Sequence, residues 1–423
     1  MIDSHCHLNL DHFEDDRDLA IGRAINDGVT GFMNIGYDRS SLRQTLALVE
    51  QYPFMFGAAG VHPHDSASYD AELDNEVRAA LDHPRMVAVG EIGLDFYRDI
   101  APRETQIDVF RKMIALSREK DHKPIVIHCR DAFNEVIETL IGEGGAYRGI
   151  FHAFSAGEAE ARSIFTLGFH VGIGGVITYR NARLAETVAA LPIEKLVIET
   201  DSPYLTPHPW RGKRNEPAFV AHVVRAIARA KNMTVADVDR ITTENYLTAM
   251  GLPAEVLPRP VYKLEDAVYI QAAAATPADL DSVGPTEGET EAVLTGVVDP
   301  LENMEHTLAL VASARERGWR VRVNSQGFAN QAAGRDITLE LQGAVDEIDV
   351  TLFGVNARQH DELAYPSVSG EGWEQIRDFV RCSVAAGIET VCEFVATPGF
   401  EPEPCRQFAR DLGARYDIRM YRS

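Results

Sequence analysis

The amino-acid sequence predicts an α/β protein: a (β/α)8 TIM barrel in the N-terminal part, followed by a smaller α/β domain that resembles a partial barrel. From residue 1 to about residue 250, short apolar segments alternate with amphipathic helical segments. Eight such units within about 250 residues are typical of a closed parallel barrel. A proline-rich segment, LPAEVLPRP, then separates this part from a second alternating region.

Eight apolar segments have the length and composition of buried parallel strands. They span residues 1–3, 31–35, 55–59, 86–90, 124–128, 149–151, 169–173 and 196–199. Amphipathic helices are predicted between them, for example over residues 17–26, 106–120, 132–141 and 182–191, and two more over 217–231 and 235–250. No Gly-x-Gly-x-x-Gly follows the first strand, which disfavours an open, doubly wound sheet.

Three prolines in nine residues indicate a stiff linker and a domain boundary. We therefore expect domains at residues 1–252 and 263–423, joined by a linker at 253–262. In the second domain, strands and helices are expected at 293–298, 304–317, 320–324, 347–353, 373–386, 390–395 and 404–412. The Gly-, Thr- and acid-rich stretch 279–291 is expected to form a loop.

Composition narrows the function. No apolar run reaches the length of a membrane span, the N-terminus MIDSHCHLNL lacks a signal-peptide pattern, and five scattered cysteines do not form a disulfide framework. A cytoplasmic protein that does not bind membranes is expected. The formal net charge of −23 excludes a broad basic face of the kind that binds duplex DNA non-specifically. A phosphate-bearing substrate would have to be held locally, by metal ions and a few cations at a strand end.

Polar residues follow the predicted strands at the end where parallel barrels place their active sites. They are His5, His7, His62, His64, Glu91, Asp95, His128, Arg130, His152, Glu199 and Asp201. Imidazoles and carboxylates are ligands for zinc, manganese or magnesium. His5 and His7 alternate along a strand and should point the same way. The set exceeds what one catalytic ion needs, which favours two divalent ions with Glu91 as a bridge.

Each element has a simpler explanation when taken alone. A single His-x-His is more often incidental, His128 or His152 alone would more often be a core histidine, and Asp201 alone could cap the turn before Pro203. Metal-compatible side chains at five strand ends of one domain make the joint interpretation the better one.

The first 250 residues resemble the TatD family of metal-dependent deoxyribonucleases, among the amidohydrolase-like barrels. The resemblance rests on MIDSHCHLN, GVHPHD, VAVGEIGLDFYR, PIVIHCRDAF, FHAFSAG, VIETDSPYLTP and RGKRNEP, in family order. It implies that His5, His7 and Glu91 hold one metal, and that Glu91, His128 and His152 hold the other. Asp201 would ligate the first metal and take the proton from the attacking water.

The resemblance also implies that His62 and His64 face the substrate phosphate. Arg130 could stabilise developing negative charge, or form a salt bridge with Asp95 or Glu199. The run from Arg214 to Pro217 is expected to order a loop, and Cys6 to pack in the core. Tyr97 and Phe96 could form a stacking surface for a terminal base, although plain packing explains them equally well.

The region after about residue 262 faintly resembles the radical S-adenosylmethionine proteins. The similar segments are TGVVDPLEN, VRVNSQGFAN, EIDVTLFGVN and AGIETVCEFV. That chemistry needs Cys-x3-Cys-x2-Cys for an iron–sulfur cluster, whereas the corresponding segment here reads YIQAAAAT. Cys382, Cys392 and Cys405 have the wrong spacing. Either the resemblance is accidental or the domain is a degenerate remnant without a cluster, and we favour the remnant.

Three functions follow from these patterns. The first is a two-metal nuclease, a 3′-to-5′ exonuclease on single-stranded DNA or RNA, as the resemblance implies. The second is a D-aminoacyl-tRNA deacylase that uses the same metals on an ester carbonyl. The third is a scaffold or binding module without catalysis, against which the intact ligand set argues. Metal identity, physiological substrate and oligomeric state are left open by the sequence.

Overall fold

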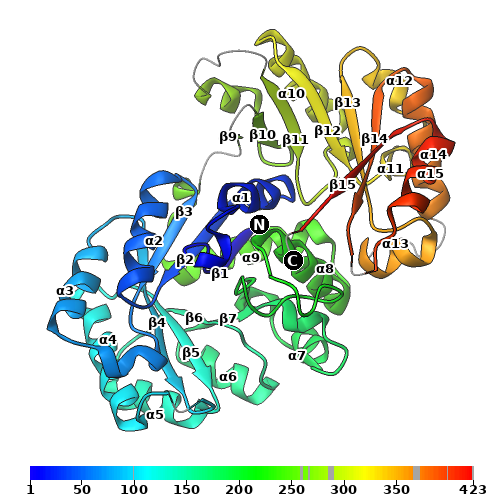
Figure 1. Ribbon diagram of the computed structural model, residues 1–423. Helices are drawn as coiled ribbons and strands as arrows, with labels where there is room; N and C mark the ends of the chain where they lie inside the picture. Colours follow the sequence, from blue (N-terminus) through cyan, green and yellow to red (C-terminus); the bar gives the residue numbers. More distant parts are fainter. Residues whose placement is uncertain are drawn as a thin grey trace. The chain divides into compact units, whose positions relative to one another are not determined.

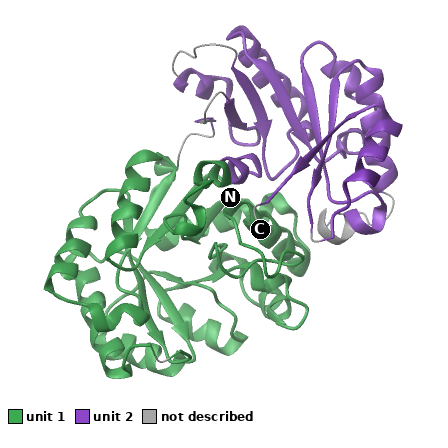
Figure 2. Ribbon diagram, viewed as in Figure 1, with its two compact units in different colours: residues 1–21, 29–258 green, residues 22–28, 259–423 purple. Residues whose placement is uncertain are grey.

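The computed structural model describes residues 1–423 except 99, 258–260, 265–266, 284–289, 365–371, 398 and 422–423. The chain divides into two compact units (Figures 1 and 2). Unit 1 comprises residues 1–21 and 29–258, and unit 2 comprises residues 22–28 and 259–423.

The sheet of unit 1 consists of eight parallel strands in sequential order, β1 to β8. Their bounds are Ile2–Cys6, Gly31–Gly36, Met55–Ala59, Met86–Asp95, Ile125–Arg130, Gly149–Phe151, His170–Ile173 and Leu196–Ile198. Two backbone hydrogen bonds join the ends of β8 and β1: Asp201 N–H donates to His5 C=O at 2.9 Å, and His7 N–H donates to Ser202 C=O at 2.8 Å. They bring the first and last strands together, as a (β/α)8 barrel requires.

Helices lie around the outside of these strands (Figure 1). They are α1 to α9, with bounds Arg17–Asn26, Arg39–Gln51, Ala71–Ala80, Arg103–Glu119, Phe133–Glu143, Glu158–Thr166, Leu184–Ala190, Val220–Lys231 and Val235–Met250. Several begin at a side-chain cap. Asp38, Asp70 and Thr234 each accept a hydrogen bond from a backbone N–H in the first turn of the helix that follows. Among the described residues, no helix combines the length and apolarity needed to cross a membrane.

The strands are apolar because both of their faces are buried. Ile2, Met33, Phe56, Val126 and Val197, from five different strands, lie in one apolar cluster with residues of α9. Burial on both sides explains why the segments lack a two-residue alternation and were recognisable as short continuous apolar runs.

Strand β4 extends to Asp95, five residues beyond the predicted end at residue 90. Its last residues are held by Gln106 of α4, which is fully buried. The Gln106 side-chain oxygen accepts from Asp95 N–H at 2.9 Å, and its amide donates to Asp95 C=O at 3.1 Å and Ala101 C=O at 2.9 Å. A residue of the following helix, 11 positions after Asp95, thus holds the end of the strand. The local sequence pattern did not predict this extension of β4.

Unit 2 contains a second sheet, in the order β15-β14-β13-β12-β11-β10-β9. Strands β10 to β15 are parallel, and β9 is antiparallel to β10. From β9 to β15 the bounds are Val261–Leu264, Ala267–Gln271, Glu291–Thr295, Arg320–Ser325, Glu347–Leu352, Glu389–Val395 and Arg415–Arg419. Helices α10 to α15 are Met304–Glu316, Ala329–Ala333, Thr338–Leu341, Ala357–Ala364, Gly372–Ala385 and Pro402–Leu412.

The two faces of the unit 2 sheet differ in polarity. Val321, Val323, Ile348 and Val350 join an apolar cluster with α10, α14 and α15. The alternate residues of the same strands carry charge, and Arg322 pairs with Asp349 at 2.8 Å. Here the strands do alternate with a period of two, because only one face packs against helices.

Several elements of unit 2 were not predicted. Strands β9, β10 and β15 and the short helices α11, α12 and α13 are present in addition to the expected ones. Part of the stretch 279–291, expected as a loop, lies in the 3-10 helix Pro277–Ser282, and residues 284–289 lie outside the described residues. Short elements that depend on neighbouring strands carry little periodicity of their own.

We expect Gln106→Leu to lower the free energy of unfolding by about 2–4 kcal/mol, since it leaves one N–H and two C=O groups buried without a partner. Urea unfolding followed by circular dichroism measures the change. Gln44→Leu on the exposed side of α2 is the matched control and should leave stability within about 0.5 kcal/mol of wild type. Equal effects of the two substitutions would contradict the role of Gln106.

Candidate metal centre

The Glu91 carboxylate lies among four imidazoles at the carboxyl ends of the barrel strands. Its Oε1 is 2.7 Å from His128 Nδ1, 2.7 Å from His152 Nε2 and 3.6 Å from His62 Nε2. Its Oε2 is 3.3 Å from His5 Nε2. His128 Nδ1 and His152 Nε2 are themselves 3.1 Å apart. The two carboxylate oxygens therefore face two different sets of ring nitrogens.

Asp201 forms the second acidic position. Its Oδ1 lies 3.3 Å from His7 Nε2 and 3.6 Å from His5 Nε2. His5 contributes to both acidic positions, and its ring stacks on His152 with centroids 4.0 Å apart. The sequence-predicted ligands His5, His7, Glu91, His128, His152 and Asp201 are thus brought together from five strand ends.

The backbone around Asp201 is tightly fixed. Asp201 has φ +55°, a left-handed conformation that is unfavourable for residues other than glycine. Its N–H is bound by His5 C=O, and the preceding Thr200 is held through both its N–H and hydroxyl by buried Asp3. On the other side, the Asn215 amide donates to Thr200 C=O at 2.7 Å and Tyr204 C=O at 2.5 Å. These bonds offset the backbone strain and set the direction of the carboxylate.

Two further carboxylates orient the histidines. Asp95 Oδ2 lies 3.1 Å from His128 Nε2 and 3.0 Å from His64 Nε2. His128 Nε2 faces Asp95 and its Nδ1 faces Glu91, so Asp95 fixes the orientation of the ring. Glu199 accepts from Ala153 N–H at 2.5 Å, next to His152. Gly172 makes room for it, because a Cβ there would lie 1.9 Å from Glu199 Oε2.

The electrostatics favour an ionised, anionic centre. Burial by itself raises the pKa of Glu91, but His152, His62 and His128 around it hold that pKa well below its usual range. The pKa of Asp201 is also lowered despite burial, through the hydrogen bond with His7. Burial and the neighbouring imidazoles lower the pKa of His5 to about 4, so this ring is a neutral nitrogen donor at pH 7.

The pKa values of His128 and Glu199 are raised, in contrast to those of His5, Glu91 and Asp201. Burial by itself lowers the pKa of His128, but Asp95 and Glu91 raise it to about 9. Burial raises the pKa of Glu199 well above its usual value, and the acidic neighbours Asp201 and Asp3 add to the effect. The surroundings therefore keep Glu91 and Asp201 ionised. The pKa of Asp95 is also lowered despite burial, through the hydrogen bond with His128.

The donor set fits divalent cations. Both ring nitrogens of His5, and Nδ1 of His7 and of His152, are buried and make no hydrogen bond within the described part of the chain. Three groups each place their ligand atoms within 4.8 Å of one another: His5, His7 and Glu91; His5, His152 and Asp201; and His62, Glu91 and His128. Among these atoms His5 Nε2 lies beside both Glu91 and Asp201, and imidazole nitrogens that converge with carboxylate oxygens in this way suit a divalent ion.

The remaining sequence-predicted residues lie at the rim. His62 is close enough to join the Glu91 group, and His64 contacts Asp95 instead. The guanidinium of Arg130 lies 4.0 Å above the ring of Tyr97, and in the described chain it forms no ion pair with Asp95 or Glu199. Tyr97 is 60% exposed.

Phe96 and Cys6 are packing residues. Phe96 is buried and packs under Arg103, so a stacking role is left to Tyr97. The Cys6 thiol is buried and faces Met33 C=O, as expected of a core side chain that points away from the ligands.

Sequence reasoning did not assign site roles to Asp95, Glu199 or Asn215. The first two stand in the quoted motifs EIGLDF and VIETDSP, only a few residues from a ligand, which is the signal that could have identified them. Asn215 stands in RNEP, 14 positions after Asp201. Only the fold shows that it binds the backbone on both sides of Asp201.

A model of the family described as "TatD related DNase" matches residues 2–251, more than half of the chain. The chain belongs to this family. It is 39% identical over 247 residues to the uncharacterized metal-dependent hydrolase YabD of Bacillus subtilis, covering 58% of this chain and 96% of the relative. It is 33% identical over 260 residues to the 3′-5′ ssDNA/RNA exonuclease TatD of Erwinia amylovora, covering 60% and 99%.

Among solved structures, YjjV, a TatD homolog from Escherichia coli, matches with a TM-score of 0.57 and 27% identity, covering 60% of this chain and 98% of that one. The shared part is the barrel with the site described above, and the family model ends at residue 251. Membership of the TatD family makes this protein a metal-dependent hydrolase that acts on ester bonds.

We expect Asn215→Ala to lower turnover by about 10- to 100-fold, because loss of its amide frees the backbone that aims Asp201. Hydrolysis of a generic phosphodiester such as bis(p-nitrophenyl) phosphate measures this loss. Asn245 is the matched control: its amide also binds two carbonyls, of Ile193 and Leu196, but at the start of β8. Both substitutions should destabilise the barrel similarly, and only Asn215→Ala should affect turnover. Equal turnover losses would contradict this role.

Proposed function

We propose that this TatD-family hydrolase is a two-metal 3′-to-5′ exonuclease on single-stranded DNA or RNA. The observation that carries the proposal is the position of Glu91, whose two carboxylate oxygens face His5 on one side and His128 and His152 on the other. A single carboxylate between two sets of nitrogen donors is suited to bridge two cations. Relatives named as 3′-5′ ssDNA/RNA exonucleases support the choice of substrate.

In this proposal, His5, His7, Glu91 and Asp201 hold one ion, and Glu91, His128 and His152 hold the other. Magnesium, manganese and zinc all suit this mixture of imidazole and carboxylate ligands. When bound, the two ions supply Lewis acidity at the phosphoryl group and lower the pKa of water. The residues of the chain would hold the two ions in position and carry out the proton transfers beside them.

Asp201 is proposed as the general base. The lowered pKa keeps its carboxylate ionised, and the surrounding backbone bonds fix its direction, so it can accept the proton of the attacking water. Asp95 acts through His128 and is a positioning residue. His62, His64 and Arg130 are proposed to contact the phosphate of the substrate at the rim, where Arg130 makes no ion pair within the described chain.

Exposed aromatic rings support a single-stranded substrate. Tyr97 is 60% exposed, and one face of its ring is covered by Arg130. Tyr204 is 48% exposed, with its ring centroid 6.0 Å from that of His7. Unstacked bases bind to such rings, whereas bases within a duplex cannot. The acidic balance of the chain, −23, agrees with recognition of a strand end rather than of a long duplex.

The second unit is proposed to be a degenerate radical S-adenosylmethionine domain over residues 263–423. Its parallel strands β10 to β15 alternate with helices, as in a partial barrel. Its three cysteines lie in different elements: Cys382 in α14, Cys392 in β14 and Cys405 in α15. Burial raises the pKa of each thiol, which disfavours the thiolate form that an iron–sulfur cluster requires.

Metal analysis and activity together test the nuclease proposal. Wild-type protein should hold about two divalent ions per chain and no cluster iron, and a chelator should abolish 3′-end trimming of a labelled single strand. We expect Glu91→Gln to lose at least one ion and to lower turnover by about 1,000-fold or more. Glu244→Gln on the exposed side of α9 is the control and should change neither.

Three results would overturn the proposal. A stoichiometry of one ion per chain at full activity would show that a second metal ion is not needed. Wild-type activity of Glu91→Gln would show that Glu91 does not bridge two ions. Faster hydrolysis of D-aminoacyl-tRNA than of any oligonucleotide makes the deacylase the correct function.

Tyr97 tests strand recognition. We expect Tyr97→Ala to raise KM for single-stranded oligonucleotides about tenfold, the loss of one stacked base, with kcat nearly unchanged. Tyr97→Phe keeps the ring and should retain the wild-type KM. An unchanged KM in Tyr97→Ala would assign the stacking to another ring.

A further inference from the structure

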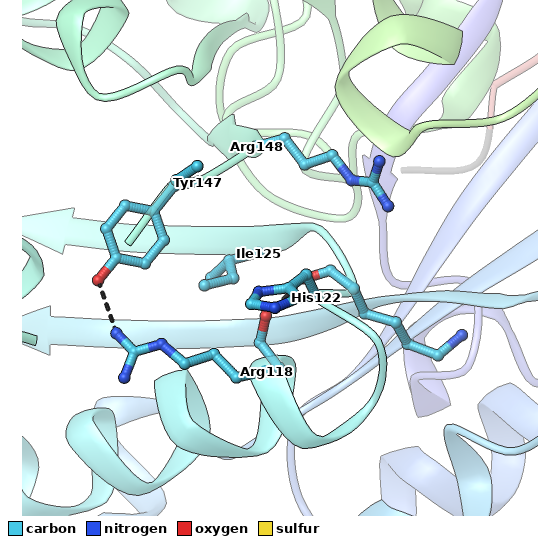
Figure 3. Close-up of a pocket in the computed structure, with 8 residues that line it drawn as sticks. Arg118, His122, Ile125, Tyr147 and Arg148 are labelled. Atoms are coloured by element: carbon cyan, nitrogen blue, oxygen red, sulfur yellow. Dashed lines mark hydrogen bonds between the residues drawn. The ribbon is translucent and has the colours of Figure 1, made fainter. Parts of the chain in front are cut away.

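A basic depression lies at the opposite end of the barrel strands from the metal centre (Figure 3). It is formed where the chain enters β5 and β6, just before Ile125 and Gly149. Its charged lining residues are Arg118, His122, Lys123 and Arg148. The enclosed space is only about 10 Å³, so a ligand would bind at the mouth of the depression, in contact with solvent.

The charge of this depression is unusual for the chain. Four of its eight lining residues carry basic side chains and none carries a carboxylate, in a protein with a formal net charge of −23. Carboxylates lie near the depression, and Asp82 and Asp121 both act on the charge of Lys123. Glu143 approaches Arg118 at 3.6 Å, and Asp82 is bound by Lys120 at 2.5 Å. A local basic surface on an acidic protein attracts anions to that place alone.

One wall of the depression is rigid. Arg118 donates to the carbonyls of Glu143 and Gly144 at the end of α5, and to the Tyr147 hydroxyl at 3.2 Å (Figure 3). Arg118 therefore has a structural role in capping that helix. Its positive charge is shared between these carbonyl dipoles and the Glu143 carboxylate, which lies 3.6 Å from Nη1.

The other basic groups have unused donors. Lys123 uses one of its three N–H groups on Met86 C=O at 2.9 Å. The side chains of His122 and Arg148 make no hydrogen bond or ion pair with any residue that the structure describes, although the Arg148 C=O accepts from Ile125 N–H at 3.0 Å. Burial lowers the pKa of Lys123, and an anion beside it would relieve the cost of its charge.

We propose that this depression is a phosphate-binding site, distinct from the metal centre, in which Lys123, His122 and Arg148 bind the phosphate oxygens. Arginine binds phosphate through paired N–H groups and lysine binds it as a point charge, and together they match a tetrahedral oxyanion. The ligand is inorganic phosphate or the terminal phosphate of a nucleotide or oligonucleotide. The proposal does not depend on the nuclease function.

The two sites share strands without sharing ligands. His128 lies three residues after Ile125 on β5, which separates them by about 10 Å at the rise of a β-strand. One phosphate group cannot contact the metal ligands and the basic depression at the same time. A substitution that inactivates one site should therefore leave the other intact, so that binding at the second site can be measured alone.

The experiment uses the full-length Glu91→Gln protein in chelator, so that phosphate has no metal to bind. Isothermal titration calorimetry is run with inorganic phosphate, with a nucleoside 5′-monophosphate, and with a short oligonucleotide with and without a 5′-phosphate. We expect saturable binding of phosphate that weakens about tenfold or more in Arg148→Gln and in Lys123→Met. Arg162→Gln, an exposed arginine of α6 outside the depression, is the control and should bind as the parent does.

The relative affinities identify the source of the phosphate. Equal binding of inorganic phosphate and the nucleotide indicates a site for the free ion, and preference for the phosphorylated oligonucleotide indicates a strand end. Arg148 is exposed, so Arg148→Gln keeps the test valid if Lys123→Met fails to fold. Absence of binding to Glu91→Gln, or binding unchanged by Arg148→Gln, overturns the proposal.

Discussion

Burial of the Glu91 carboxylate among imidazoles is the constraint on which the site depends. A carboxylate that is 3% exposed is costly unless opposite charges surround it. Ring nitrogens of His5, His62, His128 and His152 lie 2.7 to 3.6 Å from its oxygens. The raised pKa of His128 supplies positive charge, whereas the lowered pKa values of His5 and His62 leave those two rings neutral. The same arrangement, with neutral rings, presents lone pairs to cations. The interior of the site is therefore built for metal ions more than for internal hydrogen bonding.

A second layer of residues keeps this arrangement in place. Gln106 holds the backbone of Asp95, Asp95 holds His128, and Asn215 and Asp3 hold the backbone on the two sides of Asp201. These residues bind carbonyls and N–H groups that the barrel would otherwise leave unpaired where its strands become loops. The same hydrogen bonds thus stabilise the carboxyl end of the barrel and fix the orientation of the candidate metal ligands.

The two ends of the barrel strands carry side chains of opposite charge. The carboxylates Glu91 and Asp201 lie at the carboxyl end of the barrel strands, and the basic groups around Lys123 and Arg148 lie at the opposite end. If the two proposals hold, a phosphate-bearing molecule is bound through metal ions at one end and through basic side chains at the other.

The sequence by itself determined the barrel and predicted the candidate metal ligands. Continuous apolar runs specify strands buried on both sides, and each ligand directly follows such a run, so His5, Glu91, His128, His152 and Asp201 could be assigned to one rim. Only the tertiary structure decided which groups meet. His62 approaches Glu91, while His64 contacts Asp95. Arg130 stacks on Tyr97, and Asn215 supports the backbone at Asp201. All of these contacts join elements that are far apart in the chain. Such contacts follow from barrel closure and packing, which no local pattern encodes.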